Sequence, residues 1–282
     1  MRYSQEVIQP MTRKQLPSTG LLRDYASRNP GTLLIGKRVF HYEEVVSTQD
    51  IAGKLARQGA EEGTVIIAEK QTKARGRQGR SWASPDGGLY LSIILRPNLE
   101  PARALQLPLV AGVAVAGAIK KVTALQPRLK WPNDIIIAGK KVGGILTETS
   151  TKKGKIDHTV LGIGLNVNTA RSLFPEAIRE TATSLAEESG RNISPLELLQ
   201  CLFGEFEALY VEFLACGFDK IREQWKAMSN TIGSRVKINS GGAEIEGEAL
   251  DIDSEGFLLL RRENGDVERV ISGDVSPTTT RL

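Results

Sequence analysis

Short apolar runs and longer amphipathic stretches alternate through the middle of the chain. The runs "TVIIAE" (64–69) and "GLYLSIIL" (88–95) are rich in aliphatic residues and are bounded by glycine or charge, which predicts buried strands. Residues 102–122 have helical length and an apolar face, with Pro108 at the start of the helix or at a kink. Strand character resumes over 129–137, 140–149 and 158–167. The alternation predicts a domain of mixed strands and helices.

A second helix is marked by its N-terminal signals. Ser194 precedes Pro195, and Glu197 follows three residues after the serine, which is the pattern of a capping box. Apolar residues then recur at helical spacing, and we interpret this stripe as core packing. Its members are Leu198, Leu199, Leu202, Phe203, Phe206, Leu209, Tyr210 and Phe213.

After residue 231 the pattern changes to short strands joined by glycine-containing turns. Four strand-like segments fall within about 50 residues, which predicts a small barrel, and the Asn264-Gly265 pair predicts a type I′ hairpin. We therefore divide the chain into an N-terminal extension (1–35), a larger domain (36–231) and a C-terminal domain (232–282). The extension is expected to be too short for a helix-turn-helix with its wing, which needs about 60 residues.

Composition narrows the function classes. The chain is 40% hydrophobic and 25% charged, as is usual for a globular protein. Two cysteines and two histidines argue against a disulfide framework and a histidine-rich metal site. The chain shows neither a run of about 18 apolar residues nor an apolar signal core, so we expect no membrane span and a cytoplasmic location. A net charge of +4 permits an anionic partner without requiring one.

The stretch "KARGRQGRSW" (73–82) concentrates positive charge. Lys73, Arg75, Arg77 and Arg80 stand around two glycines with no acid among them. Such a stretch could coat a nucleic-acid backbone, form a solvated hairpin tip, or close over a small anionic ligand. It occurs once, between two predicted buried strands, and this placement favours the loop over a ligand.

Three further segments carry polar residues next to strands. "LKWPND" (129–134) places a lysine, an asparagine and an aspartate before an apolar strand, and "GKKVGGIL" (139–146) sets lysines beside paired glycines. "GIGLNVN" (162–168) resembles part of a dinucleotide fingerprint but lacks its third glycine. Each signal is weak alone, and their order along the chain is more specific.

With "VVSTQD" (45–50), these motifs resemble those of the biotin–protein ligases, and the resemblance covers roughly residues 35–282. It implies a mixed β-sheet flanked by helices, related to class II aminoacyl-tRNA synthetases, followed by an SH3-like barrel. Many members of the family carry an N-terminal DNA-reading domain, but the first 35 residues are too short for one, so we expect the monofunctional type without it. The basic loop separates this family from the lipoate ligases, which share the fold.

The activity implied by the resemblance has two steps. Biotin and ATP give biotinyl-AMP and pyrophosphate, with Mg²⁺ accompanying the ATP, and the biotinyl group then passes to a lysine of a biotin carboxyl carrier domain. We further expect a homodimer and, for want of a recognition domain, no specific DNA binding. Alternatives are a lipoate or octanoate ligase on the same scaffold, a biotin-sensing transcriptional repressor and, last, a pure nucleic-acid binder.

The family's functional residues carry over to positions in this sequence. Lys141 and Arg77 match the catalytic positions, and Lys140 is the rival of Lys141. The biotin-binding positions are Ser47, Thr48, Gln49, Gln71, Arg75, Gly76, Arg77, Lys141, Gly144, Gly162 and Gly164. The ATP-binding positions are Arg77, Arg80, Lys130, Asn133, Lys141 and Asn166, and the metal position is Asp134.

Several of these residues also have a structural interpretation. Ser47 with Asp50 fits a capping box, and Asp134 could cap the turn after Pro132. Trp82 could pack beneath the basic loop or line the apolar slot that holds the biotin ring. Two positions depart from the family pattern. Gln49 stands where asparagine is usual and Ala74 stands where glycine is usual, and neither change removes a charged catalytic group.

Overall fold

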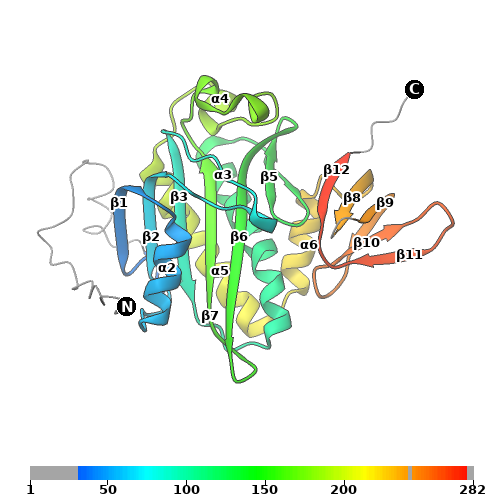
Figure 1. Cartoon of the computed structure of the whole chain (residues 1–282), viewed down its shortest axis with the longest axis horizontal. Coiled ribbons are helices and arrows are strands. Elements are labelled where there is room, and N and C mark those ends of the chain that lie inside the picture. The colour runs from blue at the N-terminus through cyan, green and yellow to red at the C-terminus, as the bar shows by residue number, and fades with distance from the viewer. Residues whose placement is uncertain (1–30, 241–242, 278–282) are drawn as a thin grey trace, which may run out of the picture.

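Strand pairing divides the protein into two sheets (Figure 1). The computed structural model describes residues 31–240 and 243–277, so most of the predicted extension lies outside it. The larger sheet has seven strands in the order β1-β2-β3-β7-β6-β5-β4. Their bounds are β1 (Val39–Val45), β2 (Val65–Gln71), β3 (Gly88–Leu95), β4 (Arg128–Lys130), β5 (Asp134–Ile137), β6 (Lys140–Lys152) and β7 (Lys155–Asn166). Only the β1–β2 pair is parallel in this sheet, so the predicted mixed sheet is confirmed.

Helices lie on both faces of the larger sheet. They are α2 (Thr48–Arg57), α3 (Leu107–Thr123), α4 (Leu185–Ser189), α5 (Pro195–Cys216) and α6 (Asp219–Met228), with 3₁₀ turns η1 (Arg77–Gly79), η2 (Pro101–Gln106), η3 (Arg171–Leu173) and η4 (Glu176–Ile178). Both predicted N-caps are confirmed, because the Ser47 and Ser194 hydroxyl oxygens each accept from a backbone N–H three residues later, at 3.3 Å. The predicted proline lies in the first turn of α3.

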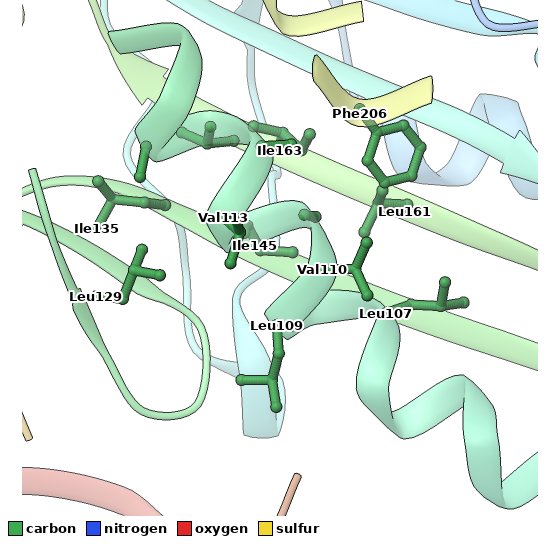
Figure 2. Packing of buried hydrophobic residues seen from close by; sticks show 14 of the residues in the cluster. Leu107, Leu109, Val110, Val113, Leu129, Ile135, Ile145, Leu161, Ile163 and Phe206 are labelled. Carbon is green, nitrogen blue, oxygen red and sulfur yellow. The ribbon is translucent and has the colours of Figure 1, made fainter. Parts of the chain in front are cut away.

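The main core fills the space between the larger sheet and helices α3, α5 and α6. Figure 2 shows the part of it where α3 and Phe206 of α5 meet residues of the sheet. Alternation along β3 explains the division, because side chains on a strand point to opposite faces. Leu91 and Ile93 belong to this main core, whereas Ile94 packs with Ala52 and Ala56 of α2 on the other face. Ser92 and Ile94 share that second face, beneath α2.

One helical segment is unusually apolar. Pro101–Thr123 is long and apolar enough to cross a membrane by length and composition, but 72% of its most apolar window is buried inside the protein. Leu107, Val110 and Val113 lie among the core residues in Figure 2. The packing of a central core helix accounts for its hydrophobicity.

The smaller sheet is antiparallel, with the order β11-β10-β9-β8-β12. Its strands are β8 (Arg235–Ser240), β9 (Ala243–Ile252), β10 (Leu258–Arg261), β11 (Val267–Val270) and β12 (Asp274–Pro277). It packs on the larger domain through Trp131, whose indole donates to the Gly256 carbonyl at 3.0 Å. The arrangement is that of a small C-terminal SH3-like unit.

The predicted hairpin between β10 and β11 is present, but its turn type was wrong. Gly265 has φ +90°, whereas Asn264 does not adopt a positive φ, as a type I′ turn would require. Gly265 donates to the Arg262 carbonyl at 3.0 Å, and Arg262 donates to Asp266 at 2.8 Å. Three residues, 263–265, therefore lie inside the Arg262–Asp266 hydrogen bond, and among them the glycine alone is in the left-handed region.

Candidate active site

A cavity of about 630 Å³ lies against the larger sheet. Every residue assigned above to biotin, ATP or metal lines it. The walls come from the start of α2, the basic loop between β2 and β3, the β5–β6 hairpin and β7, and the small sheet adds β8 and β12. The roles of the lining residues stay predictions, but the fold brings together segments that are far apart in sequence.

One end of the cavity is neutral and closely hydrogen-bonded. Gln71 Oε1 accepts from the Thr48 backbone N–H at 2.8 Å, and the Thr48 hydroxyl oxygen lies 3.1 Å from the same Oε1. Gln71 Nε2 donates to the Ser84 hydroxyl at 3.1 Å. Ser47 Oγ accepts from the Asp50 N–H, so the capping role and a place in the wall coexist. The helix start thereby holds short polar side chains in fixed positions.

Gln49 is buried at the same end. Its Nε2 donates to the Val160 carbonyl at 3.0 Å, and its Oε1 accepts from Ser92 at 3.0 Å. A Cβ at Gly162 would lie 2.7 Å from Gln49 Oε1, so this position of β7 accommodates only glycine unless the glutamine moves. Gln49, which stands where asparagine is usual, therefore packs closely against Gly162 of β7.

Trp82 forms the wall between the neutral and charged ends. Cβ atoms at Gly144 and Gly164 would lie within 3.0 Å of its indole, and Lys141 Nζ lies 5.3 Å from its ring centroid. Gly144, the second of the paired glycines, and Gly164 of β7 thus give the indole room to lie against the sheet. Trp82 lines the cavity, which is one of the two interpretations given above.

Two lysines and one aspartate form the floor of the charged end. Asp134 Oδ1 lies 2.5 Å from Lys141 Nζ, and Oδ2 lies 3.1 Å from Lys130 Nζ. Burial raises the pKa of the Asp134 carboxyl, but the two ammonium groups outweigh it and hold the pKa below its usual value. The carboxylate is therefore ionised and fixes both lysines.

Lys141 and Lys140 occupy different environments. Lys141 lines the cavity, and its backbone pairs with the segment after η4, accepting from the Thr183 N–H at 3.0 Å and donating to Thr181 O at 2.8 Å. Lys140 does not line the cavity. The placement matches the choice of Lys141 as the candidate catalytic lysine.

The predicted metal role of Asp134 fits the geometry poorly. Mg²⁺ bound by a protein usually takes one or two carboxylate oxygens together with waters and substrate phosphates. Both Asp134 oxygens already face ammonium groups, and the described residues contain no group of three or more His, Cys, Asp or Glu side chains suited to a metal. We therefore assign Asp134 a positioning role for the lysines and derive no step through a protein-bound metal.

Ion pairs hold the basic loop on two sides. Arg75 pairs with Asp50 at 2.7 Å and with Glu148 at 3.4 Å. On the other side Arg80 pairs with Asp274 of β12. Inside the loop, the Gly76 N–H donates to Arg80 O at 2.6 Å, so the loop is a defined turn and not an open tip.

Arg77 is the most enclosed arginine of the loop. It donates to Asn133 Oδ1 at 3.2 Å and to the Gly273 carbonyl at 3.3 Å. Burial lowers the pKa of its guanidinium from the usual value, although the carboxylates of Asp274 and Asp134 oppose the shift. Arg77 is thus a partly desolvated cation over the cavity, where its attraction for an anion is strong.

Two predicted ATP-binding asparagines are held by backbone carbonyls. Asn133 Nδ2 donates to Ile145 O at 2.8 Å, and Asn166 Nδ2 donates to Thr183 O at 2.9 Å. These bonds orient each amide, and the Asn133 oxygen in addition accepts from Arg77 at 3.2 Å.

Sequence reasoning missed several wall residues. Ser92 carried a signal, since it is a lone hydroxyl in the apolar strand "GLYLSIIL". Asp274 gave none, because it reaches the cavity from the second domain, 194 residues after Arg80. Phe174 and Ile178 of the η3–η4 segment also line the cavity.

Comparisons with known proteins agree on one family. The model described as "Biotin/lipoate A/B protein ligase family" matches residues 42–166, and that described as "Biotin protein ligase C terminal domain" matches residues 231–276. "Bifunctional ligase/repressor BirA" of Bacillus subtilis is 37% identical over 86% of this chain and 75% of its own length. "Biotin--[acetyl-CoA-carboxylase] ligase" of Paracoccus denitrificans is 34% identical over 78% of this chain and 92% of its own length.

A comparison with solved structures points to the same family. The biotin protein ligase from Aquifex aeolicus in complex with biotin and ATP superposes with a TM-score of 0.73 at 34% identity, over 85% of this chain and 98% of that one.

Proposed function

The chain belongs to the biotin/lipoate A/B protein ligase family, and from this premise we propose that it is a biotin–protein ligase. It activates biotin with ATP to biotinyl-AMP and transfers the biotinyl group to a lysine of an acceptor protein. One observation carries the proposal. Within a single cavity, a buried neutral hydrogen-bonding end adjoins an end lined by Arg77, Arg80, Lys130 and Lys141.

The first step brings two anions together. A biotin carboxylate oxygen attacks the α-phosphorus of ATP, a new oxygen–phosphorus bond forms, and pyrophosphate leaves with the electrons of the broken bond. Positioned cations lower the barrier by stabilising the charge that develops. We infer that Lys141 contacts both the carboxylate and the α-phosphate, while Arg77 and Arg80 meet the phosphates. Mg²⁺ arrives with ATP as part of the substrate.

The second step releases AMP. The acceptor lysine, as a neutral amine, attacks the carbonyl carbon of biotinyl-AMP, the bond from that carbon to the phosphate oxygen breaks, and the amine proton is lost. The mixed anhydride must be kept from water until then. We infer that the basic loop covers it, with Arg75 and Gly76 against the biotin side and Trp82 separating the two halves.

The acceptor protein, the oligomeric state and the cellular location are further proposals. We propose that the acceptor is the biotin carboxyl carrier domain of a biotin-dependent carboxylase, because a relative is named for acetyl-CoA carboxylase. We propose a homodimer, to be tested by sedimentation, and a cytoplasmic location, in keeping with the unpaired Cys201 and Cys216. The domain limits 36–231 and 232–282 are likewise proposed.

We also propose that the protein does not read operator DNA, although a relative carries the name ligase/repressor. Weak binding through phosphate contacts alone would fall steeply with added salt. A sequence-selective footprint at physiological salt would contradict this proposal.

The test of the main proposal is pyrophosphate exchange into ATP. Exchange should depend on biotin and should be absent with octanoate or lipoate alone, since the hydrogen-bonding end suits a ureido ring and not an alkyl chain. Exchange supported by octanoate and not by biotin would establish the lipoate-type alternative instead.

A further inference from the structure

Ser92 is a buried hydroxyl that none of the preceding roles uses. It lies in the middle of β3, where its neighbours along the strand are apolar, and it pairs across the sheet with Gly162 of β7. It is fully buried and yet borders the cavity. Its hydroxyl contacts Thr48 Oγ1 at 2.9 Å and Gln49 Oε1 at 3.0 Å, the first two side chains of α2.

The direction of each hydrogen bond follows from the atoms involved. Gln49 Nε2 donates to the Val160 carbonyl, since the reverse orientation of the amide would place two acceptors together at 3.0 Å. Gln49 Oε1 therefore faces Ser92 and can only accept, so it takes the single Ser92 proton. The Ser92 oxygen must then accept from the Thr48 hydroxyl.

Thr48 is consequently fixed as an acceptor toward anything else. Its proton points to Ser92, and its remaining oxygen lone pairs are free for a donor. The rival direction, toward Gln71 Oε1 at 3.1 Å, would leave the Thr48 and Ser92 oxygens facing each other at 2.9 Å without a proton between them. Gln71 Oε1 already accepts a hydrogen bond from the Thr48 backbone N–H at 2.8 Å.

We propose that Ser92 is a positioning residue that sets Thr48 as the acceptor for one N–H of the biotin ureido ring. The proposal rests on the proposed function and deepens it. Gln49 is part of the device, because its amide spans from Val160 to Ser92. An asparagine, which is one methylene shorter, would not reach both partners from the same backbone position.

Ser92→Ala keeps the Cβ and removes both hydrogen bonds. The Thr48 proton then has no fixed direction: it can turn to Gln71 Oε1 at 3.1 Å or toward the cavity, where it opposes the ligand N–H, and Gln49 Oε1 loses its donor. We expect the KM for biotin in pyrophosphate exchange to rise by about tenfold, with kcat and the KM for ATP nearly unchanged. Gln49→Asn should act in the same direction, and Ser92→Thr, which keeps the hydroxyl, should restore much of the affinity.

A ligand series separates this role from a general structural one. Two biotin analogues, each with one ring N–H replaced by CH₂, are compared with biotin in the wild type and in Ser92→Ala. The wild type should prefer biotin to one of the analogues by about tenfold, and the variant should bind biotin and that analogue almost equally. Thr159→Val removes a buried hydroxyl that bonds Thr149 at 3.1 Å in the same sheet and serves as the matched control, with unchanged preference.

Equal weakening of all three ligands by Ser92→Ala would overturn the inference, as would a preference that Ser92→Ala leaves intact. Thermal unfolding of the Ala and Thr variants checks that both fold. A wild-type enzyme without biotin-dependent exchange would instead remove the proposed function itself. The two failures are therefore distinguishable.

Discussion

The two ends of the cavity are held in opposite ways. At the neutral end, Thr48, Gln49 and Ser92 are at most 5% exposed, and their side chains bond to one another and to the Val160 carbonyl at 2.9 to 3.0 Å. At the charged end, the side chains of Lys141 and Arg80 are 37% and 58% exposed, and each faces a carboxylate. Buried neutral networks resist rearrangement, whereas cations that are partly exposed can exchange partners at lower cost.

This contrast indicates how one cavity handles two kinds of substrate. The neutral end is complete before a ligand arrives, so it recognises by shape and by donor direction. The carboxylates of Asp134 and Asp274 stand where cations will later meet substrate anions, and they keep those cations together in the meantime. Each prediction below tests one side of the contrast.

The largest expected effect is on chemistry at Lys141. Lys141→Ala should slow adenylate formation by about 10³-fold, because it removes the cation assigned to both reacting anions. Single-turnover formation of biotinyl-AMP measures the effect. Lys140→Ala, which removes the adjacent lysine outside the cavity, is the control and should change the rate little. A worse loss in Lys140→Ala would reverse the assignment.

The next effect concerns Asp134. Asp134→Asn keeps the shape but removes the charge that fixes two lysines, so the adenylation rate should fall on the order of 10²-fold through misplacement of Lys141. Raising Mg²⁺ should not restore the rate. Recovery at high Mg²⁺ would show that Asp134 binds metal after all. Asp86→Asn, which breaks an exposed pair with Lys70, is the control.

A smaller effect is expected where Trp82 separates the two ends. Gly164→Ala would place a Cβ 2.8 Å from the indole, so the free energy of unfolding should fall by about 1–3 kcal/mol and biotin affinity should fall with it. Gly204→Ala on α5 has open space around it and should raise stability by about 0.5–1 kcal/mol. Urea unfolding of both variants gives the comparison. Equal stability in both would mean that the indole is not held against β7.

The neutral end and the cations of the charged end were largely predictable from the sequence. Local patterns carried them: Ser47 follows capping rules, and Arg77 and Lys141 stand in short motifs whose order is specific. Ser92 and Asp274 were not predicted, because their importance depends on which strand lies beside which. Register places Ser92 under α2, and packing of the small sheet brings Asp274 to the loop. Neither fact is encoded in a local pattern.

The smallest effect tests the tie between the small sheet and the basic loop. Asp274 pairs with Arg80 and lies 4.0 Å from Arg77, while the neighbouring Gly273 carbonyl accepts from Arg77. A partly exposed pair of this kind contributes about 0.2–1 kcal/mol. Asp274→Asn should therefore raise loop opening by only about two- to fivefold in the ligand-free enzyme.

Hydrogen exchange at the Gly76 and Arg80 amides reports this opening, because both donate within the loop, to Arg80 O and Arg77 O. The difference between the two proteins should shrink at high salt, as screening weakens the pair in the wild type. Asp266→Asn, on the β10–β11 hairpin of the same sheet, should leave exchange unchanged. Equal protection in Asp274→Asn would mean that Arg75, through Asp50 and Glu148, holds the loop alone. In that case the charged end would be organised from the larger domain only, and the small sheet would bound the cavity without fixing its cations.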